Sequence, residues 1–266
     1  MNLENVKLVV SDMDGTLLNN QGEVSKEFFE LFQRLEDRGI HFAAASGRQY
    51  HSIVNKLSAI KDRITVIAEN GGIARQGNEE LLITPLPSQY IADVIPVLRK
   101  VEGAFPVLCG KDSAYIETRD ETFINMFREY YSEFKVVDEL TRVNHDEFLK
   151  IAVYHFDGSE QHLYPLLSHL EKELQVKISG AHWLDLSHPD ANKGFALEKL
   201  QNKMGLSKEE TMVFGDYNND LEMLDRAYFS YAMENAHPNV KKRARFNTGS
   251  NEHRGVESIL EKLLRS

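Results

Sequence analysis

Short apolar runs alternate with amphipathic stretches along the first 84 residues. The run Val6–Val10 is short and β-branched, as in a strand buried on both faces. Ser25 can then cap a helix that Gly39 ends. That helix would bury one apolar face, formed by Phe28, Leu31, Phe32 and Leu35. Two further apolar runs, Ile40–Ala45 and Thr65–Ala68, read as strands, so the segment predicts a strand–helix–strand order.

Each predicted strand runs directly into a polar cluster. The clusters are Ser11–Gly15, Ser46–Arg48 and Glu69–Gly72. A strand–helix–strand order predicts a parallel sheet with right-handed crossovers, in which ligands gather at the carboxyl ends of the strands. We therefore expect the clusters to meet at one functional edge.

The pattern changes from about Thr84 and returns after Lys193. Ser88 can start a helix, although Pro96 inside it predicts a kink or an interruption. Helical stretches are expected near 120–131 and 160–173. Strand-like pieces recur between the helices: Phe105–Leu108, Ala114–Glu117, Leu149–Phe156 and Gln175–Ser179.

The original order resumes with a helix from Lys193 to Met204, ended by Gly205. The strand Thr211–Phe214 then leads into Gly215 and Asp216. The predicted fold is α/β, with a doubly wound parallel core. We expect this core to comprise residues 1–84 and 188–266, and residues 85–187 to form an inserted α+β cap.

Charge and composition exclude several classes of protein. A net charge of −10 argues against nucleic-acid binding, and the basic run Lys241–Arg245 reads as a solvated helix face. No segment is long enough to span a membrane, and Met1–Asn5 does not begin a signal peptide. The lone Cys109 cannot form an internal disulfide, so we expect a cytoplasmic protein. The sequence leaves its oligomeric state open.

Asp12 and Asp14 are the strongest candidates for chemistry. Two acids two residues apart, where a strand opens into a turn, can aim both carboxyls into one site. If a metal keeps one ionised, the other can hold a proton for acid–base work. A solvated turn is the alternative. A calcium loop is disfavoured, because Thr16 and Leu17 occupy positions that need a ligand and a glycine.

Four motifs in order resemble those of the haloacid dehalogenase-like hydrolases. They are Val9–Leu18, Ala45–Arg48, Lys193–Gly194 and Gly215–Asp220. The cluster at 69–72, the long middle insert and the late Asn235–Ala236 resemble the Cof-type branch, whose members carry a large α/β cap. The resemblance spans nearly the whole chain. It implies a phosphatase, with a phosphosugar mutase or a phosphate-binding regulatory protein as alternatives.

The resemblance assigns roles to the acids and to one lysine. Asp12 would be the nucleophile that forms an aspartyl-phosphate, and Asp14 the general acid and base. Mg²⁺ would be held by the Asp12 carboxylate, the Asp14 carbonyl and the Asp216 carboxylate. Lys193 would neutralise charge on the transferring group.

Further residues are expected around the phosphate. The substrate-binding set implied by the resemblance is Met13, Ser46, Gly47, Arg48, Lys193 and Asn219. The alternative for Arg48 is an ion pair with an acid. Asp220, Thr16 and Asn70 are expected just behind it. Tyr217 replaces a residue that is usually small, which would narrow the entrance.

The expected substrate is a small phosphorylated metabolite. Sugar phosphates are the leading class by resemblance, with nucleotide or cofactor phosphates as alternatives. His182 and Trp183, near the end of the middle segment, are interpreted as ordinary packing residues rather than substrate contacts.

Overall fold

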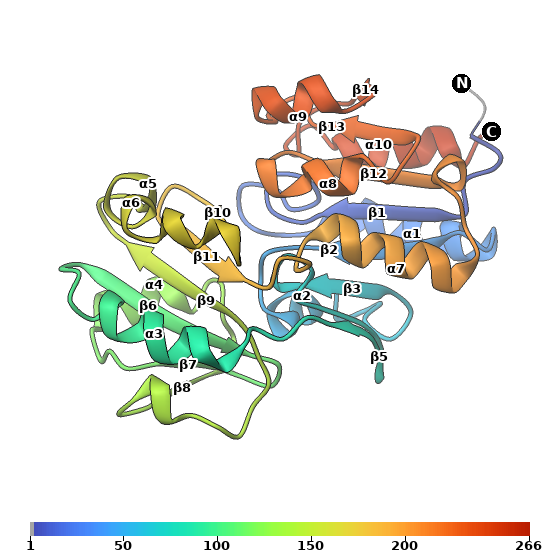
Figure 1. Ribbon diagram of the computed structural model, residues 1–266. Helices are drawn as coiled ribbons and strands as arrows, with labels where there is room; N and C mark the ends of the chain where they lie inside the picture. The colour runs from blue at the N-terminus through green and yellow to red at the C-terminus, as the bar shows by residue number, and fades with distance from the viewer. Residues whose placement is uncertain (1–2) are drawn as a thin grey trace.

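The computed structural model describes residues 3–266, so Met1 and Asn2 lie outside the described residues. Two lobes lie side by side, each built on its own sheet (Figure 1). The larger sheet, the core sheet, contains β1 (Leu8–Asp12), β2 (His41–Ala45), β3 (Thr65–Ala68), β4 (Ile73–Gln76), β5 (Glu79–Ile83), β12 (Thr211–Gly215), β13 (Phe229–Ala232) and β14 (Phe246–Asn247).

The core sheet is doubly wound, as the sequence predicted. Its strand order is β14-β13-β12-β1-β2-β3-β4-β5, and the strands from β14 to β3 are parallel. The chain winds outward from β1 through β2 and β3, and later from β12 in the opposite direction. The winding therefore reverses between β1 and β12, where open parallel sheets form ligand-binding crevices.

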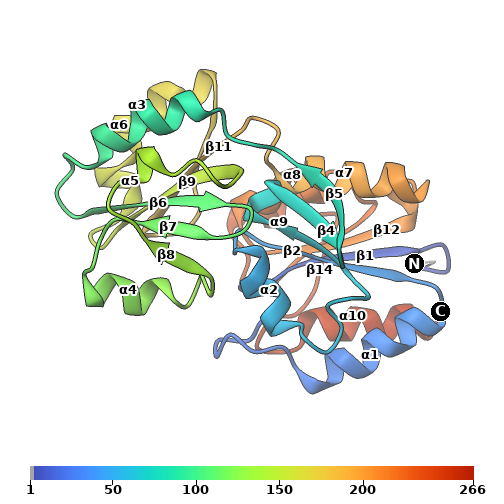
Figure 2. The same cartoon turned by 90° about the horizontal axis from the view of Figure 1, so that it is seen from below.

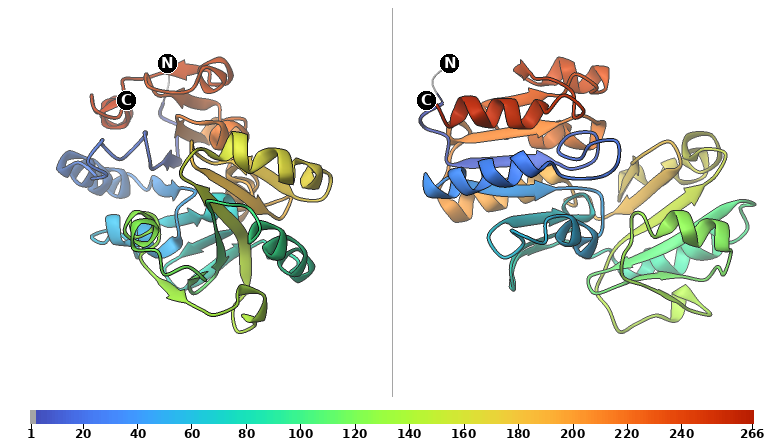
Figure 3. Two further views of the ribbon diagram at one scale, coloured as in Figure 1. Left: turned by 90° about the vertical axis from the view of Figure 1, so that its left-hand side faces the viewer. Right: turned by 180° about the vertical axis from the view of Figure 1, so that it is seen from behind.

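Helices cover both faces of the core sheet. Helices α1 and α10 lie on one face, and α7 and α8 on the other (Figures 2 and 3). The core helices are α1 (Lys26–Asp37), α2 (Tyr50–Lys56), α7 (Lys193–Met204), α8 (Leu221–Leu224), α9 (Pro238–Arg243) and α10 (Gly255–Leu263). Ser25 caps α1 through the Phe28 amide, as expected. The basic residues Lys241–Arg243 are exposed on α9, as expected of a solvated face.

The second lobe, from α3 to β11, is called the cap below. Its sheet has the order β10-β11-β9-β6-β7-β8 and is antiparallel except for the β7–β8 pair. The strands are β6 (Ala104–Gly110), β7 (Ala114–Ile116), β8 (Phe134–Val136), β9 (Phe148–His155), β10 (Gln175–Ile178) and β11 (Trp183–Ser187).

Helices also cover both faces of the cap sheet. The cap helices are α3 (Ser88–Leu98), α4 (Glu121–Phe127), α5 (Ser159–His162) and α6 (Tyr164–Leu167). Helix α3 lies on one face, while α4 packs on the other through Phe123 and Phe127 (Figure 2). The cap is therefore a three-layered unit with its own hydrophobic core.

Several elements differ from the sequence-based prediction. The hairpin β4–β5 and the strands β8 and β11 were not expected. The stretch 160–173 forms three short helical pieces rather than one helix, and Pro165 lies at the start of the second piece. Strand β11 was missed because Asp185 interrupts its apolar pattern, although that side chain is buried in the structure.

Polar contacts hold the cap against the core. The Gln49 side chain donates to the Glu133 carbonyl at 2.8 Å and accepts from the Glu133 amide at 3.1 Å. Lys177 of the cap pairs with Glu222 of the core at 2.9 Å. Within residues 3–266, no helix combines the length and the apolar character that crossing a bilayer requires.

Candidate active site

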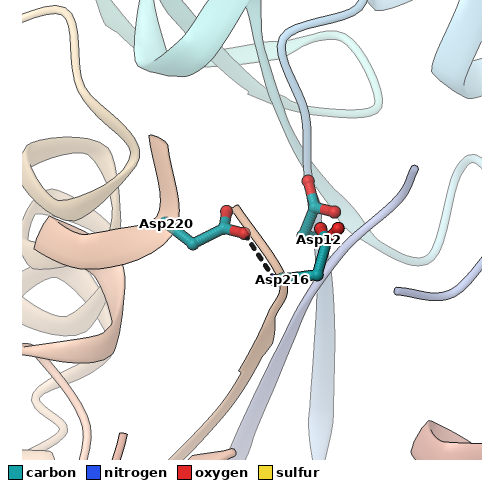
Figure 4. Close-up of side chains that lie close together, drawn as sticks. All are labelled: Asp12, Asp216 and Asp220. Atoms are coloured by element: carbon teal, nitrogen blue, oxygen red, sulfur yellow. Dashed lines mark hydrogen bonds between the residues drawn. The ribbon is translucent and has the colours of Figure 1, made fainter. Parts of the chain in front are cut away.

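Three carboxylates converge where the winding of the core sheet reverses. Asp12 ends β1, Asp216 directly follows β12, and Asp220 lies just before α8 (Figure 4). One oxygen from each lies within 4.8 Å of the other two. Adjacent strand ends thus bring together acids more than 200 positions apart in the sequence, as the predicted sheet edge required.

A tight turn after Asp12 makes this approach possible. Gly15 has a φ of +76°, in the left-handed region that glycine adopts without strain. A Cβ at Gly15 would lie 2.4 Å from Asp216 Oδ2, so a larger residue there would displace the Asp216 carboxylate. Thr16 then donates a hydrogen bond to Asp216 Oδ1 at 3.2 Å. The turn therefore positions the Asp216 carboxylate as well as that of Asp12.

Lys193 is fully buried among the acids. Its Nζ donates to Asp12 Oδ1 at 2.6 Å and to Asp220 Oδ1 at 2.7 Å. The second Asp220 oxygen accepts from the amides of Asp216 and Tyr217. Both Asp220 oxygens are therefore committed to protein donors, which makes Asp220 a support for Lys193 and for the loop after β12.

The carboxylates have unusual proton affinities. Burial raises the pKa of Asp12 well above its ordinary value, and repulsion from Asp220 adds to the effect of burial. Burial, followed by the charge on Asp220, raises the pKa of Asp216 to about 7. For Lys193, burial alone would lower the pKa, but the adjacent Asp12 and Asp220 raise it, so this lysine stays protonated. One buried cation thus faces three acids.

This donor set fits a divalent cation. Three acids and one lysine leave an excess of negative charge in a buried site, and carboxylate oxygen is the ligand that Mg²⁺ prefers. Asp12 and Asp216 are the carboxylates available for direct coordination, because Asp220 is already engaged. The Asp14 carboxylate does not belong to the cluster, within the residues that the structure describes.

Asp14 lies at the rim of the site. Its side chain is 48% exposed and makes two hydrogen bonds with Arg48, to Nε at 2.7 Å and to Nη2 at 2.6 Å. Arg48 also donates to the Glu129 carbonyl of the cap at 2.5 Å, and its guanidinium lies 5.2 Å from the centre of the Tyr130 ring. Arg48 therefore links Asp14 to the cap.

The loop after β2 supplies Ser46 and Gly47 to the same cavity. Ser46 is buried, and its Oγ accepts from the Arg48 amide at 3.1 Å. The Met13 side chain is fully buried in the hydrophobic core and does not line the cavity. Met13 can therefore contact a ligand only through its main chain.

Asn70 and Asn219 form a bridge beside the cavity, which Asn219 also lines. Asn219 Nδ2 donates to Asn70 Oδ1 at 3.0 Å, and Asn70 Nδ2 donates to Asp185 Oδ2 of the cap at 3.1 Å. Asn70 has a φ of +55°, a left-handed conformation that asparagine tolerates better than most residues. The bridge connects the loops after β3 and β12 to the cap.

The sequence-based prediction missed a buried ion cluster beside this bridge. Lys150 of β9 pairs with Glu69 at 2.8 Å and with Asp185 at 3.0 Å, and it donates to the Gly47 carbonyl at 3.2 Å. A lysine within the apolar run Leu149–Phe156 was the signal that could have revealed it, because a lysine is almost never buried unless it is paired.

A cavity of about 570 Å³ lies between the core and the cap. Asp12, Asp14 and Asp216 line its core end, and His182 and Trp183 line its cap end. Trp183 also packs against Tyr154, with ring centroids 5.0 Å apart. Both residues pack against Tyr154, as the sequence-based interpretation favoured, and both also reach the cavity wall. Tyr217, which was expected to narrow the entrance, also lines the cavity.

Comparisons with known proteins agree with this geometry. A family model described as haloacid dehalogenase-like hydrolase matches residues 9–260. A 5-amino-6-(5-phospho-D-ribitylamino)uracil phosphatase of Escherichia coli is 32% identical over 263 residues, which cover 98% of this chain and 97% of that protein.

Solved structures show the same fold. A Streptococcus mutans protein superposes with a TM-score of 0.90 at 27% identity, covering 98% of this chain and 100% of that one. A sugar phosphatase of HAD subclass IIB superposes with a TM-score of 0.83 at 21% identity, covering 97% of this chain and 98% of that one, which shows a shared fold alone.

The family match and the relatives identify a phosphoric monoester hydrolase. The chain belongs to the haloacid dehalogenase-like hydrolases, so the family resemblance is confirmed.

Proposed function

We propose that this chain is a Mg²⁺-dependent phosphatase that hydrolyses small phosphomonoesters through an aspartyl-phosphate on Asp12. The observation that carries the proposal is the convergence of Asp12 and Asp216 on one cavity, next to the Ser46–Gly47 loop, with the buried Lys193 donating to Asp12. A nucleophile, a cation site and donors for phosphate oxygens thus share one edge of the sheet.

The first step transfers the phosphoryl group to the enzyme. A carboxylate oxygen of Asp12 bonds to phosphorus while the bond from phosphorus to the ester oxygen breaks. Asp14 gives its proton to the departing oxygen, which leaves as an alcohol. In the second step, water attacks the same phosphorus, Asp14 takes the proton from that water, and the bond from phosphorus to Asp12 breaks. Inorganic phosphate then leaves.

The surrounding residues hold the transferring group. Lys193 is placed to offset negative charge next to Asp12, and the Ser46 hydroxyl and Gly47 amide are placed to hold phosphate oxygens. Mg²⁺ held by Asp12 and Asp216, with the Asp14 carbonyl, would reduce the repulsion between an anionic nucleophile and an anionic phosphate.

The division of the chain supports a closing cap. We assign residues 1–84 and 188–266 to the catalytic core and 85–187 to the cap, since the core strands end at Ile83 and resume at Thr211. Closure over the cavity would exclude water during the first step. The substrate would be a sugar or polyol phosphate, the class to which the phosphorylated ribityl chain named for the Escherichia coli relative belongs.

Phosphate release from a panel of esters tests the proposed function. The panel includes glucose 6-phosphate and 5-amino-6-(5-phospho-D-ribitylamino)uracil, each assayed with Mg²⁺. We expect release from at least one ester, and no release by an Asp12→Asn variant. Equal release by both proteins would contradict the proposed nucleophile.

Asp14→Asn should separate metal binding from turnover. Only the Asp14 carbonyl is assigned to the cation, so the affinity for Mg²⁺ should stay within about twofold. Turnover should fall by about 10²–10⁴-fold, because the amide of Asn cannot give a proton to the leaving oxygen or take one from water. Calorimetric titration with Mg²⁺ and steady-state rates provide the two measurements. Retained turnover would remove Asp14 from acid–base catalysis.

Metal dependence should vary with pH. Excess chelator should abolish phosphate release, and added Mg²⁺ should restore it. The Asp216 carboxyl must lose its proton to bind a cation, and its pKa is raised to about 7 by burial and then by Asp220. The affinity for Mg²⁺ should therefore increase about tenfold from pH 6 to pH 8, if one proton is released. Full activity in chelator, or a flat pH dependence of binding, would contradict this assignment.

A further inference from the structure

The cavity has two chemically different ends. The core end carries the acids and Arg48, whereas the cap end is largely aromatic. The residues with rings or a thioether at the cap end are Met126, Tyr130, Tyr131, Tyr154, His182 and Trp183. They come from α4 and the segment that follows it, from β9, and from the start of β11. All lie on or beside the face of the cap sheet that α4 covers.

Tyr130 and Trp183 offer aromatic surface at this end. Both are partly exposed, whereas Tyr131 and Tyr154 are buried behind them. Trp183 is held edge-on to Tyr130 and Tyr154, with ring centroids 5.7 and 5.0 Å away. Packing on this scale fixes the orientation of the indole, so its surface is a preformed wall rather than a mobile side chain.

This aromatic wall begins next to the catalytic edge. Arg48 makes two hydrogen bonds with Asp14, and its guanidinium carbon lies 5.2 Å from the centre of the Tyr130 ring. Only one side chain therefore separates the proposed general acid from the wall. A ligand with its phosphate at Asp12 would extend past Arg48 toward Tyr130 and Trp183.

The charged groups at the cap end are already committed to one another. Lys150 forms ion pairs with Glu69 and Asp185 and donates to the Gly47 carbonyl. Asp185 Oδ2 also accepts from Asn70. A hydroxyl-rich sugar ring would find few free partners among these groups. A flat ring needs fewer partners, because it gains from stacking on aromatic surface.

We propose that Tyr130 and Trp183 form a subsite for a planar, uncharged heteroaromatic ring at the far end of the phosphomonoester. This inference rests on the proposed phosphatase function and specifies its substrate class. Tyr130 and Trp183 are specificity-determining residues in this assignment, and they take no part in the transfer of the phosphoryl group.

Fluorescence provides a test that does not depend on turnover. Trp183 is the only tryptophan among the 266 residues. Excitation at the long-wavelength edge of the tryptophan absorption band avoids tyrosine, so the emission reports on the subsite itself. The Asp12→Asn variant is titrated, with Mg²⁺ present, with 5-amino-6-(5-phospho-D-ribitylamino)uracil and with ribitol 5-phosphate. The two ligands share a phosphorylated ribityl chain, and only the first carries a ring.

We expect the ring-bearing ligand to change the Trp183 emission saturably and to bind at least tenfold more tightly than ribitol 5-phosphate. Free N-acetyltryptophanamide corrects for light absorbed by the ring. Equal affinities, or emission that neither ligand alters, would overturn the ring subsite.

Kinetics of cap variants distinguish recognition from structure. The measured quantity is kcat/KM for the ring-bearing ester divided by kcat/KM for the ring-free ester. Trp183→Leu should reduce this ratio at least tenfold. Trp183→Phe should retain most of it. Phe156→Leu is the matched control: Phe156 is a 40% exposed cap aromatic that contacts Tyr154 but does not line the cavity. This control should leave the ratio within twofold.

The possible failures have different signatures. A Trp183→Leu variant that loses both activities equally would show that the wall only supports the cap, and would overturn the subsite. If the native protein hydrolyses neither ester while ring-dependent quenching persists, the proposed phosphatase function fails and the ring subsite stands.

Discussion

Replacing Asp12 with Asn should reduce phosphate release at least about 10³-fold, while making the metal-free protein more stable. The amide cannot act as the nucleophile, and removal of a nucleophile typically costs most of the catalysis. The stability gain follows from the crowded acids. Burial and repulsion from Asp220 raise the pKa of Asp12, so its negative charge destabilises the folded state.

The size of this stability effect depends on pH. Asp12 binds its proton more tightly in the folded state than in the unfolded state, so the native protein loses stability as the pH rises above the ordinary carboxyl range. Asn carries no charge at any pH. The variant should therefore unfold about 2–4 °C higher at pH 8 in chelator, which corresponds to about 1 kcal/mol in a protein of this size.

Calorimetric scans at pH 8 and pH 4 measure the difference in unfolding temperature between the native protein and the Asp12→Asn variant. The gain should shrink at pH 4, where Asp12 is protonated in the folded native protein. A variant that unfolds at a lower temperature at both pH values would contradict the proposed electrostatic strain. Substantial phosphate release by a homogeneous preparation would remove Asp12 as the nucleophile.

Replacing Lys193 with Met should destabilise the protein and stop turnover together. Methionine has a similar length, but it leaves Asp12 and Asp220 buried without their common cation. Breaking a buried ion pair in this way typically costs about 3–5 kcal/mol. Loss of the positive charge beside the transferring group should reduce turnover by at least about 10²-fold. Denaturant unfolding and steady-state rates measure the two effects.

Lys199→Met is the matched control, because Lys199 lies on the exposed face of the same helix. It should alter the free energy of unfolding by less than about 0.5 kcal/mol. A double variant, Lys193→Met with Asp220→Asn, should recover much of the lost stability but not the activity. If Lys193→Met unfolds like the native protein, the buried cation is not what keeps the acids together.

The local pattern predicted much of the core because its elements are determined by nearby residues. Helix α1 begins after Ser25 and buries the apolar face that the spacing predicted. Strand β3 spans Thr65–Ala68, the same bounds as the predicted strand. Parallel strands with polar ends then led directly to an edge where Asp12 and Asp216 meet.

The cap was less predictable because its polar residues are paired across the fold. Lys150 and Asp185 interrupt the apolar patterns of β9 and β11, yet both are buried, because each is the other's partner. The segment 159–172 carries apolar residues at helical spacing, but it forms three short helical pieces, from which Leu163, Leu167 and Leu170 pack into the cap core.

The roles of the acids in phosphoryl transfer were implied by the family resemblance. The sequence by itself predicted the parallel α/β core, an inserted segment, and the meeting of Asp12 and Asp216 at one edge of the sheet. These features rest on local spacing, and on the rule that adjacent parallel strands end at one edge. Only the tertiary structure revealed the ion cluster around Lys150, the contact of Arg48 with both Asp14 and the cap, and the aromatic wall at Trp183. Each of these depends on residues far apart in the chain, whose proximity is decided by how the cap packs on the core.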